Sequence, residues 1–385
     1  MRSFFVQKNS FLLLLMSILI VGSLVYLFIS SNVSTAPPTM VTPTGTGPLA
    51  LKIPPTPLHP PKPCASKGRD FQMGVAFPDW GTTAYGGSDT KWLTELQNLR
   101  VQTASCWVEM PILLHQESLT STTVTQGIST SSVSSFTYGV RFAQSLGFHI
   151  FVVAQLQASG PQPWSGKIIF STYEQQQQWF QSYWQALKPY MVAAAQMGVE
   201  QFALGTEYEL LETTAPASLW NTLIAEARSV YPGTLTYDMN WGSLQRKPPS
   251  WMRNPILKMI GVSAYVPLVN TPQQVDQKQL SGLWKKIVKQ QLDNFSKALG
   301  EPILISEIGY PNKTDALYQP WNTTSTAPPD PAQQAAACDA ALANIIPDPH
   351  ILGSFFWGWD NVGDHGLHDL PATTVIHSYY TSLQA

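Results

Sequence analysis

Eight short apolar segments recur along residues 69–385, at intervals of roughly 25 to 50 residues. Their apolar residues run continuously instead of alternating with polar ones, which is typical of parallel strands buried on both faces. Eight such strands, separated by helices, close naturally into a (β/α)8 TIM barrel. The expected strands are residues 71–77, 103–108, 150–156, 202–205, 235–240, 260–265, 303–306 and 354–359.

Helical patterns lie between several of these strands, and they predict a parallel sheet. A doubly wound open sheet is the alternative arrangement, but no glycine-rich phosphate loop follows the first strand. The closed barrel is therefore the preferred fold. The expected helices are residues 90–100, 173–197, 283–299 and 331–346.

The N-terminus carries 19 uncharged residues, from Phe11 to Ile29, which is long enough to span a membrane as a helix. Arg2 and Lys8 precede this stretch, and the next basic residue is Lys52. The positive-inside rule then leaves the N-terminus in the cytoplasm and the rest of the chain outside. A cleaved signal peptide is the alternative, although its apolar region is usually shorter. Either way the chain is exported, as a single-pass membrane protein or as a secreted one.

A proline-rich segment separates this stretch from the apolar repeats. Residues 31–63 contain ten prolines, with threonine, glycine and serine between them. Proline fixes φ and removes a hydrogen-bond donor, so we expect an extended, semi-rigid spacer. The predicted organisation is an anchor or signal peptide over residues 1–30, a linker over 31–68 and a catalytic domain over 69–385. The three cysteines, Cys64, Cys106 and Cys338, allow at most one disulfide.

The composition favours an uncharged ligand. Charged residues make up 12% of the chain, against about 25% in an average soluble protein. The 22 basic and 24 acidic residues show no basic excess, which argues against a nucleic-acid partner. The chain also holds 13 tryptophans and 14 tyrosines. These aromatic residues must either fill a large core or contact a ligand that carries little charge.

Two glutamates end expected strands. Glu207 follows the fourth strand and Glu307 ends the seventh, so both should lie at the catalytic face of a barrel. A buried, unpaired carboxylate is costly, and two that face one bond are what retaining glycosidases require. The alternative is that they are surface or helix-start residues. Glu209 and Glu212, which follow Glu207 closely, are expected to be loop or helix-start charges. Glu109, beyond the second strand, is a further candidate for the cleft.

Aromatic residues cluster at the same strand ends, where their rings could stack on sugar faces. Those expected in or beside the cleft are Trp80, Trp107, Trp164, Trp241, Tyr265, Tyr310, Trp357 and Trp359. Tryptophans within helices are expected in the core. Asp360, Asp364, His365 and His368 gather after the last strand but fit no specific metal motif, so no metal or cofactor is expected.

Five strand-end motifs resemble glycoside hydrolase family 113, whose members are (β/α)8 β-mannanases in a large clan of retaining glycosidases. The motifs are Gly205-Thr206-Glu207, Leu235-Thr236-Tyr237-Asp238-Met239-Asn240-Trp241, Ile260-Gly261-Val262-Ser263-Ala264-Tyr265-Val266-Pro267-Leu268, Ser306-Glu307-Ile308-Gly309-Tyr310 and Phe356-Trp357-Gly358-Trp359. The resemblance covers most of residues 70–370. The third strand departs from it, because Ala154-Gln155-Leu156-Gln157 stands where the family has a Lys-Pro-His-like segment.

The resemblance implies a role for each matching position. Glu207 would be the acid/base, Glu307 the nucleophile and Tyr265 the residue that orients the nucleophile. The other matching positions would bind substrate: Thr206 before the acid/base, Asn240 and Trp241 along the cleft, and Trp357 or Trp359 as the floor of one subsite.

The sequence therefore predicts a monomeric, membrane-tethered endo-β-glycosidase acting on a neutral polysaccharide, with β-1,4-mannan the first choice. A surface carbohydrate-binding protein without catalysis and a cell-wall transglycosylase on the same barrel are the alternatives.

Overall fold

The structure is a computed structural model of the chain, and it describes residues 64, 70–86, 90–160, 164–360 and 364–384. The expected anchor and nearly all of the expected linker lie outside these residues. Within them, no helix combines the length and the apolar character needed to cross a membrane.

Eight parallel strands form a closed barrel, which confirms the TIM-barrel prediction. Neighbouring strands pair in chain order, and the first strand pairs with both the second and the eighth, so the sheet has no free edge among these strands. The barrel strands are β1 (Gln72–Ala76), β2 (Trp107–Gln116), β4 (His149–Ala158), β5 (Gln201–Thr206), β6 (Thr234–Asn240), β7 (Ile260–Ser263), β8 (Ile303–Ile308) and β9 (Ile351–Trp357). The two-residue strand β3 (Val124–Thr125) pairs antiparallel with the end of β2.

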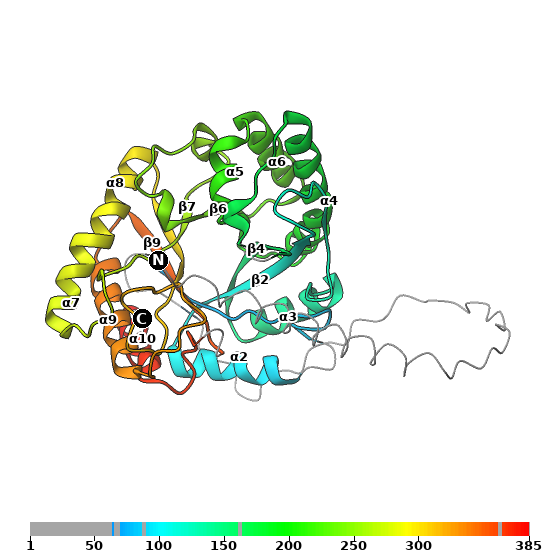
Figure 1. Ribbon diagram of the computed structural model, residues 1–385. Coiled ribbons are helices and arrows are strands. Elements are labelled where there is room, and N and C mark those ends of the chain that lie inside the picture. Colours follow the sequence, from blue (N-terminus) through cyan, green and yellow to red (C-terminus); the bar gives the residue numbers. More distant parts are fainter. Residues whose placement is uncertain (1–63, 65–69, 87–89, 161–163, 361–363, 385) are drawn as a thin grey trace, which may run out of the picture. The chain divides into compact units, whose positions relative to one another are not determined.

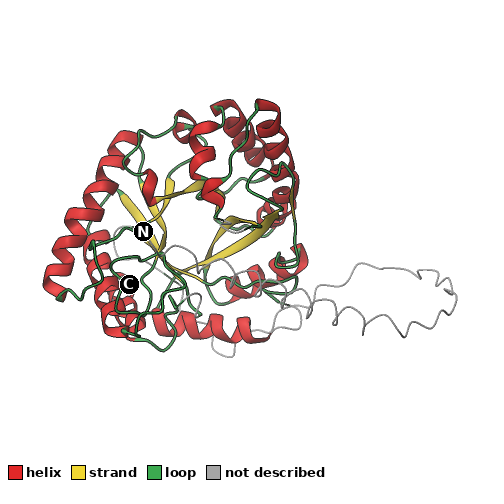
Figure 2. Ribbon diagram, viewed as in Figure 1, coloured by secondary structure: helices red, strands yellow, loops and turns green. Residues whose placement is uncertain are grey.

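Helices form a ring around the strands (Figures 1 and 2). They are α2 (Thr90–Thr103), α3 (Val133–Ser145), α4 (Tyr173–Gln196), α5 (Glu209–Thr214), α6 (Ala217–Val230), α7 (Gln277–Trp284), α8 (Gln290–Leu299), α9 (Pro331–Ile345) and α10 (Pro371–Leu383). A π-helical turn, Lys285–Lys289, joins α7 to α8. The four expected helices are present, whereas α3, α5, α6 and α10 were not anticipated.

Local sequence signals explain where the longer helices begin. Thr172 caps α4 by accepting a hydrogen bond from the Gln175 backbone, and the Gln175 side chain bonds back to Thr172, which completes a capping box. Asp330 caps α9 by accepting a hydrogen bond from the Gln333 backbone, with Pro331 at the first turn.

The second barrel strand begins later than expected. The prediction placed it at residues 103–108, but α2 continues to Thr103, and β2 starts at Trp107. The Thr103 hydroxyl donates to the Leu99 carbonyl at 2.7 Å, so this β-branched residue is accommodated in the last helical turn. As a result, residues expected beyond this strand lie inside it.

An apolar layer of the barrel interior lies beneath the polar residues at the C-terminal ends of the strands. The apolar floor consists of Phe151, Val153, Ala203, Met259, Leu304 and Phe355, all buried, with Trp107 packed against it. A larger cluster fills the space between the strands and the surrounding helices. At the N-terminal end, the Gln72 amide donates to Gln201 Oε1 at 2.9 Å, between the first residues of β1 and β5.

A disulfide joins Cys64 to Cys106, immediately before β2, with a Cα–Cα distance of 5.6 Å. The third cysteine, Cys338, is free and buried in α9. The Arg100 guanidinium donates to the Ser105 carbonyl at 2.7 Å next to this bridge. The disulfide therefore ties residue 64 to the N-terminal end of the barrel.

Removing this bridge should lower the stability of the barrel. Its cysteines are 42 residues apart in sequence, and closing a loop of that size contributes about 2–4 kcal/mol. Denaturant unfolding of the double variant Cys64→Ser, Cys106→Ser should show this loss relative to the oxidised protein. Reductant should bring the unmodified protein to the same level and leave the variant unchanged; equal stability in both forms would contradict the expectation.

Candidate active site

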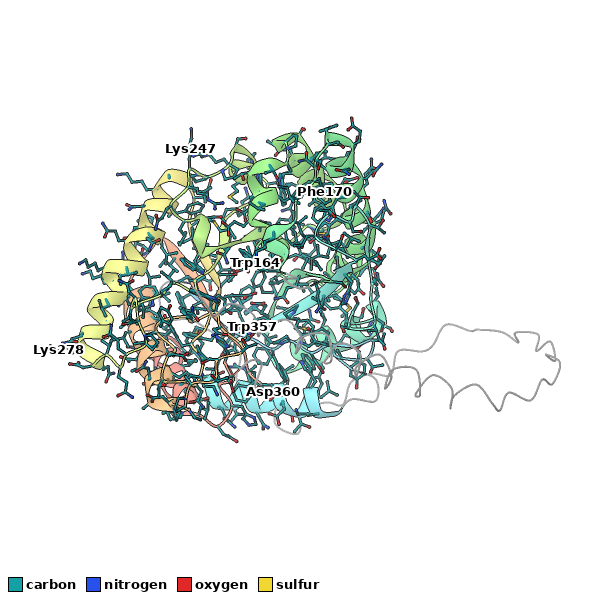
Figure 3. All side chains as sticks on the ribbon, viewed as in Figure 1. Trp164, Phe170, Lys247, Lys278, Trp357 and Asp360 are labelled. Atoms are coloured by element: carbon teal, nitrogen blue, oxygen red, sulfur yellow. A yellow bond between two sulfur atoms is a disulfide. The ribbon has the colours of Figure 1, made fainter. Side chains whose placement is uncertain are left out.

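A pocket of about 580 Å³ opens at the C-terminal ends of the barrel strands. Figure 3 shows Trp164 and Trp357 within the ring of helices at this site. Seven residues expected from the sequence line the pocket: Glu207, Glu307, Tyr265, Asn240, Trp241, Trp164 and Trp357. Glu209, Gly242, Trp321, Thr323 and His365 complete the lining. The structure thus brings Glu207, which follows the fourth barrel strand β5, and Glu307, on the seventh barrel strand β8, into one cavity.

The backbone at Glu207 is held in a left-handed conformation, with φ at 58°. Its N–H donates to the Asp238 carbonyl at 2.8 Å, and the pairing of β5 with β6 shifts register between Ala203 and Thr206. A non-glycine residue in this region costs on the order of 1–3 kcal/mol, and such strain persists only where neighbours enforce it. The irregular strand end directs the Glu207 side chain into the pocket.

Both carboxyl oxygens of Glu207 accept hydrogen bonds from neutral donors. The Trp164 indole Nε1–H donates to Oε2 at 2.9 Å, and the Asn240 amide donates to Oε1 at 2.8 Å. Burial raises the pKa of Glu207, while these two donors and Ser263 oppose the rise because they favour the ionised form.

Glu307 lies on β8, where pairing with β7 is also irregular. The Tyr265 hydroxyl donates to its Oε2 and the Gln155 amide to its Oε1, each at 3.2 Å. Burial raises the pKa of Glu307 well above its ordinary value, and the negative charges of Asp238 and Glu207 raise it further. The hydrogen bonds from Tyr265 and Gln155 act in the opposite direction. Tyr265 is therefore placed to orient this carboxyl group.

Gln155 and Trp321 are contacts that the sequence did not single out. Gln155 belongs to the third barrel strand, at the position where the sequence departs from the family pattern. Trp321 lies in the long connection between β8 and α9, and its ring stacks on Trp241 with centroids 5.4 Å apart. Because Trp321 is 43% exposed, the pair presents an aromatic surface at the rim of the pocket. A tryptophan within a polar loop was the only signal available for it.

Two tryptophans expected in the cleft lie elsewhere. Trp107 is at the N-terminal end of β2, where its ring packs 5.0 Å from that of His149, because β2 starts later than expected. Trp359 is fully buried, and its indole donates to Glu95 Oε2 at 3.2 Å. Of the two tryptophans after the last strand, Trp357 is the one that lines the pocket.

Three other expected residues lie near the cleft without lining the main pocket. The Tyr310 hydroxyl is buried and accepts a hydrogen bond from the Trp284 indole at 3.0 Å. Thr206 is 7% exposed, in the last position of β5. Trp80 borders an adjoining hollow that shares Trp164 with the main pocket.

Two further acids differ from their expected surroundings. Glu109 lies within β2, fully buried, and neither of its carboxyl oxygens has a hydrogen-bond partner in the described part of the chain. Burial and the charges of Glu307 and Asp238 raise its pKa well above the ordinary value. Glu212, expected as a loop or helix-start charge, lies in the first turn of α5, where it is buried and accepts hydrogen bonds from the Tyr237 and Ser243 hydroxyls. The position of Glu109 follows from the later start of β2.

The polar cluster after the last strand does not converge on one point. Asp360 pairs with Lys91 at 3.0 Å, and Asp364 pairs with Lys313 at 3.2 Å. Within the described ranges, no group of three histidine, cysteine or acidic side chains could hold a metal ion.

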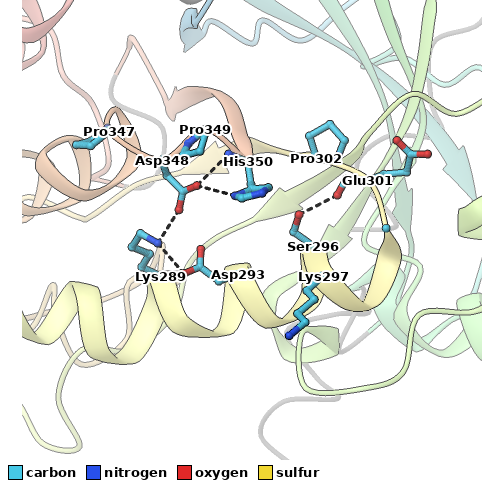
Figure 4. A pocket seen from close by; sticks show the side chains of 11 residues that line it. Lys289, Asp293, Ser296, Lys297, Glu301, Pro302, Pro347, Asp348, Pro349 and His350 are labelled. Atoms are coloured by element: carbon cyan, nitrogen blue, oxygen red, sulfur yellow. Dashed lines mark hydrogen bonds and ion pairs between the residues drawn. The ribbon is translucent and has the colours of Figure 1, made fainter.

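A second hollow, of about 760 Å³, lies near the N-terminal ends of β8 and β9 (Figure 4). The Lys289 ammonium sits between Asp293 and Asp348, at 2.6 and 2.7 Å, and His350 lies 3.4 Å from the same Asp348 carboxyl group. These charges pair with one another across α8 and the loop before β9. The arrangement is that of a stabilising ion-pair cluster, at the end of the barrel remote from Glu207 and Glu307.

Residues 79–369 match the family profile described as Glycoside Hydrolase Family 113. The chain belongs to glycoside hydrolase family 113. It is therefore a glycoside hydrolase, as the strand-end motifs implied, and the match spans nearly the whole barrel.

Solved structures of family 113 proteins share the fold of this family 113 chain. A β-1,4-mannanase of the family is 22% identical, with a TM-score of 0.69 over 81% of this chain and 99% of that one. A β-mannanase from Alicyclobacillus acidocaldarius, in complex with ManMIm, is 21% identical, with a TM-score of 0.68 over 81% and 98%. A β-glucuronidase from Ruminococcus gnavus is 11% identical, with a TM-score of 0.53 over 82% and 50%. No sequence among the curated proteins matches this chain.

Replacing Trp164 with phenylalanine should raise the pKa of Glu207. The variant keeps an aromatic ring but loses the N–H that favours the ionised carboxylate. The titration can be followed by the infrared carboxyl band that disappears in Glu207→Gln. Trp80→Phe, in the adjoining hollow, is the matched control and should leave this pKa unchanged. A lower pKa in Trp164→Phe would show that the indole does not act as a donor to Glu207.

Proposed function

We propose that this family 113 enzyme is an endo-acting β-mannanase that hydrolyses β-1,4-mannan, or a related neutral β-linked polysaccharide, with retention of configuration. The observation that carries the proposal is the pair of glutamates from the fourth and seventh barrel strands in one pocket. Their surroundings differ, since Glu207 accepts from an indole and an amide, whereas Glu307 accepts from a tyrosine hydroxyl and an amide. Two carboxyl groups in unlike environments suit one acid and one nucleophile.

In the proposed reaction Glu307 attacks the anomeric carbon while Glu207 protonates the departing glycosidic oxygen. The C–O bond to the leaving sugar breaks as the bond to Glu307 forms, which gives a glycosyl-enzyme. Glu207, now ionised, then takes a proton from water, and that water displaces Glu307 from the sugar. Tyr265 holds the Glu307 carboxyl in place for both steps, through the hydrogen bond at 3.2 Å.

The acid role of Glu207 requires a change when substrate binds. In the free protein, donors to both oxygens favour its ionised form. A glycosidic oxygen that approaches Oε2 would displace the Trp164 N–H. A sugar filling the pocket would also exclude water, which disfavours the charged carboxylate. Both effects would raise the pKa of Glu207 at the moment when its proton is needed.

The character of the pocket supports a neutral substrate. Among the described residues that line it there is no lysine or arginine, whereas glutamates and tryptophans are prominent. Such a lining repels polyanions and offers ring faces for stacking on sugars. The family match and the similar fold of two β-mannanases favour mannan among neutral polysaccharides.

We further propose that the enzyme works outside the cell, tethered by its N-terminal apolar segment or secreted. The Cys64–Cys106 disulfide supports this location, because such bonds persist mainly in oxidising compartments.

Glu207→Gln and Glu307→Ala should each reduce hydrolysis of β-mannan by roughly a thousandfold or more, because each removes one member of the acid and nucleophile pair. Glu301→Gln, at the opposite end of the barrel, is the control and should retain full activity. Reducing-sugar release and thermal unfolding should be measured together. Normal turnover by either active-site variant would refute the assignment.

Fresh digests of β-mannan, cellulose and xylan by the full-length protein should show internal cleavage of mannan and β-configured products by NMR. The α-anomer as the first product would exclude retention. Binding without release of products would identify a carbohydrate-binding protein. If a manno-oligosaccharide is supplied as substrate, products longer than that oligosaccharide would identify a transglycosylase.

A further inference from the structure

Asp238 is a buried acid beside the two glutamates that the proposed reaction does not use. It lies on β6, two residues before Asn240, which lines the pocket. Side chains alternate along a strand, so Asp238 faces the same interior as Asn240 but one layer deeper. It is fully buried, and a carboxyl group at that depth requires partners.

The contacts of Asp238 connect it to both glutamates. Its backbone carbonyl accepts the N–H of Glu207 at 2.8 Å. Its Oδ1 accepts the hydroxyl of Ser306, the residue before Glu307, at 2.5 Å. Its Oδ2 accepts the hydroxyl of Ser263 at 3.0 Å, and Ser263 is paired with Glu307 across the β7–β8 ladder. Asp238 thus holds the backbone of Glu207 and binds two residues next to Glu307: Ser306, before it in the chain, and Ser263, across from it on β7.

The carboxyl groups around Asp238 belong to three glutamates, and His365, which lines the pocket, packs its ring 6.0 Å from that of Tyr265. Glu109 faces it from β2, Glu207 from the end of β5 and Glu307 from β8, and the Tyr265 hydroxyl lies against Glu307. None of the ion pairs in the described chain involves any of these acids. Four carboxyl groups in one buried space cannot all be ionised together, so they must lose their protons in sequence.

The hydrogen bonds indicate which of Asp238 and Glu307 loses its proton first as the pH rises. Asp238 accepts two hydroxyl donors at 2.5 and 3.0 Å, which favour its ionised form, although burial raises its pKa to about 8. Glu307 accepts donors at 3.2 Å only, and Glu109 has none among the described residues. Asp238 therefore ionises before Glu307, and its negative charge raises the pKa of Glu307.

We propose that Asp238 is a positioning residue that links Glu207 to Glu307, and that its negative charge sets the lower pH limit of the reaction. The inference rests on the proposed function, in which Glu307 must be ionised to attack. An ionised Asp238 beside it keeps a proton on Glu307 until the pH is higher.

Asp238→Asn tests this directly, because it keeps the side-chain shape and removes the charge. The acid limb of kcat/KM should move to lower pH by about half a unit or more, since Glu307 then ionises without a negative neighbour. Ser306→Ala removes one donor to Asp238, which makes Asp238 harder to ionise. It should move the limb in the same direction by a smaller amount, and the double variant should move it no further than Asp238→Asn alone.

Glu212→Gln is the matched control. Glu212 is also buried, also accepts two hydroxyl donors, and its pKa is likewise raised to about 8. Its donors, Tyr237 and Ser243, do not flank Glu307, so the acid limb should stay in place. An unchanged limb in a folded Asp238→Asn protein, or an equal shift in Glu212→Gln, would overturn the proposal. If Asp238→Asn does not fold, the acid limb of kcat/KM in Ser306→Ala tests the proposal instead: a shift to lower pH supports it, and an unchanged limb overturns it.

A second measurement separates this inference from the proposed function. The carboxyl band of Glu307, identified by its loss in Glu307→Gln, can be titrated by infrared spectroscopy without substrate. A lower pKa for Glu307 in Asp238→Asn supports the coupling even if the protein does not cleave mannan. If the unmodified protein cleaves mannan normally but the pKa of Glu307 is unchanged in Asp238→Asn, the inference about Asp238 is overturned and the proposed function stands.

Discussion

The site depends on one constraint, which is that several carboxyl groups are buried together. None of these carboxyl groups forms an ion pair with a lysine, arginine or histidine in the described part of the chain. Glu109, Asp238 and Glu307 are at most 7% exposed, and Glu207 opens onto the same pocket. Charge in such a space must be stabilised by neutral donors or removed by a proton. The site uses indole, amide and hydroxyl donors, each from a different barrel strand or loop.

The barrel makes that arrangement possible because its two ends differ. An apolar layer lies beneath the pocket, and the polar residues that line the pocket occupy the end where the strands finish. Register shifts occur between β5 and β6, between β7 and β8 and between β8 and β9, so they involve the strand that precedes Glu207 and the strand that carries Glu307. Departures from regular pairing thus occur along both strands that present the glutamates, and they extend to the apolar residues Ala203 and Leu304 beneath the pocket.

The sequence predicted the barrel and its two central glutamates because both depend on local signals. A continuous apolar run identifies a buried strand, and an acid at its end stands out against it. The exact residue at which a strand begins depends on its pairing with neighbouring strands, which local sequence does not reveal. Ending α2 three residues too early misplaced both Trp107 and Glu109. Trp107 begins β2 instead of lying near its end, and Glu109 lies within β2 instead of beyond it.

Long-range contacts were also beyond the sequence. The Trp241–Trp321 stack joins two loops whose approach depends on the whole barrel, and the bond from Gln155 to Glu307 crosses between separate strands. The choice between Trp357 and Trp359 depended on where β9 ends, because Trp357 is its last residue and Trp359 turns back toward α2.

The disulfide has a mechanical consequence. A covalent bridge at Cys64 means that tension applied through the preceding residues enters the barrel at Cys106 as well as through the peptide chain before β1. The load is then shared between two adjacent strands, β1 and β2, at the end farthest from the pocket. If the enzyme is anchored while it holds a long polymer, the loops that shape the pocket lie outside the path from the anchor into the barrel.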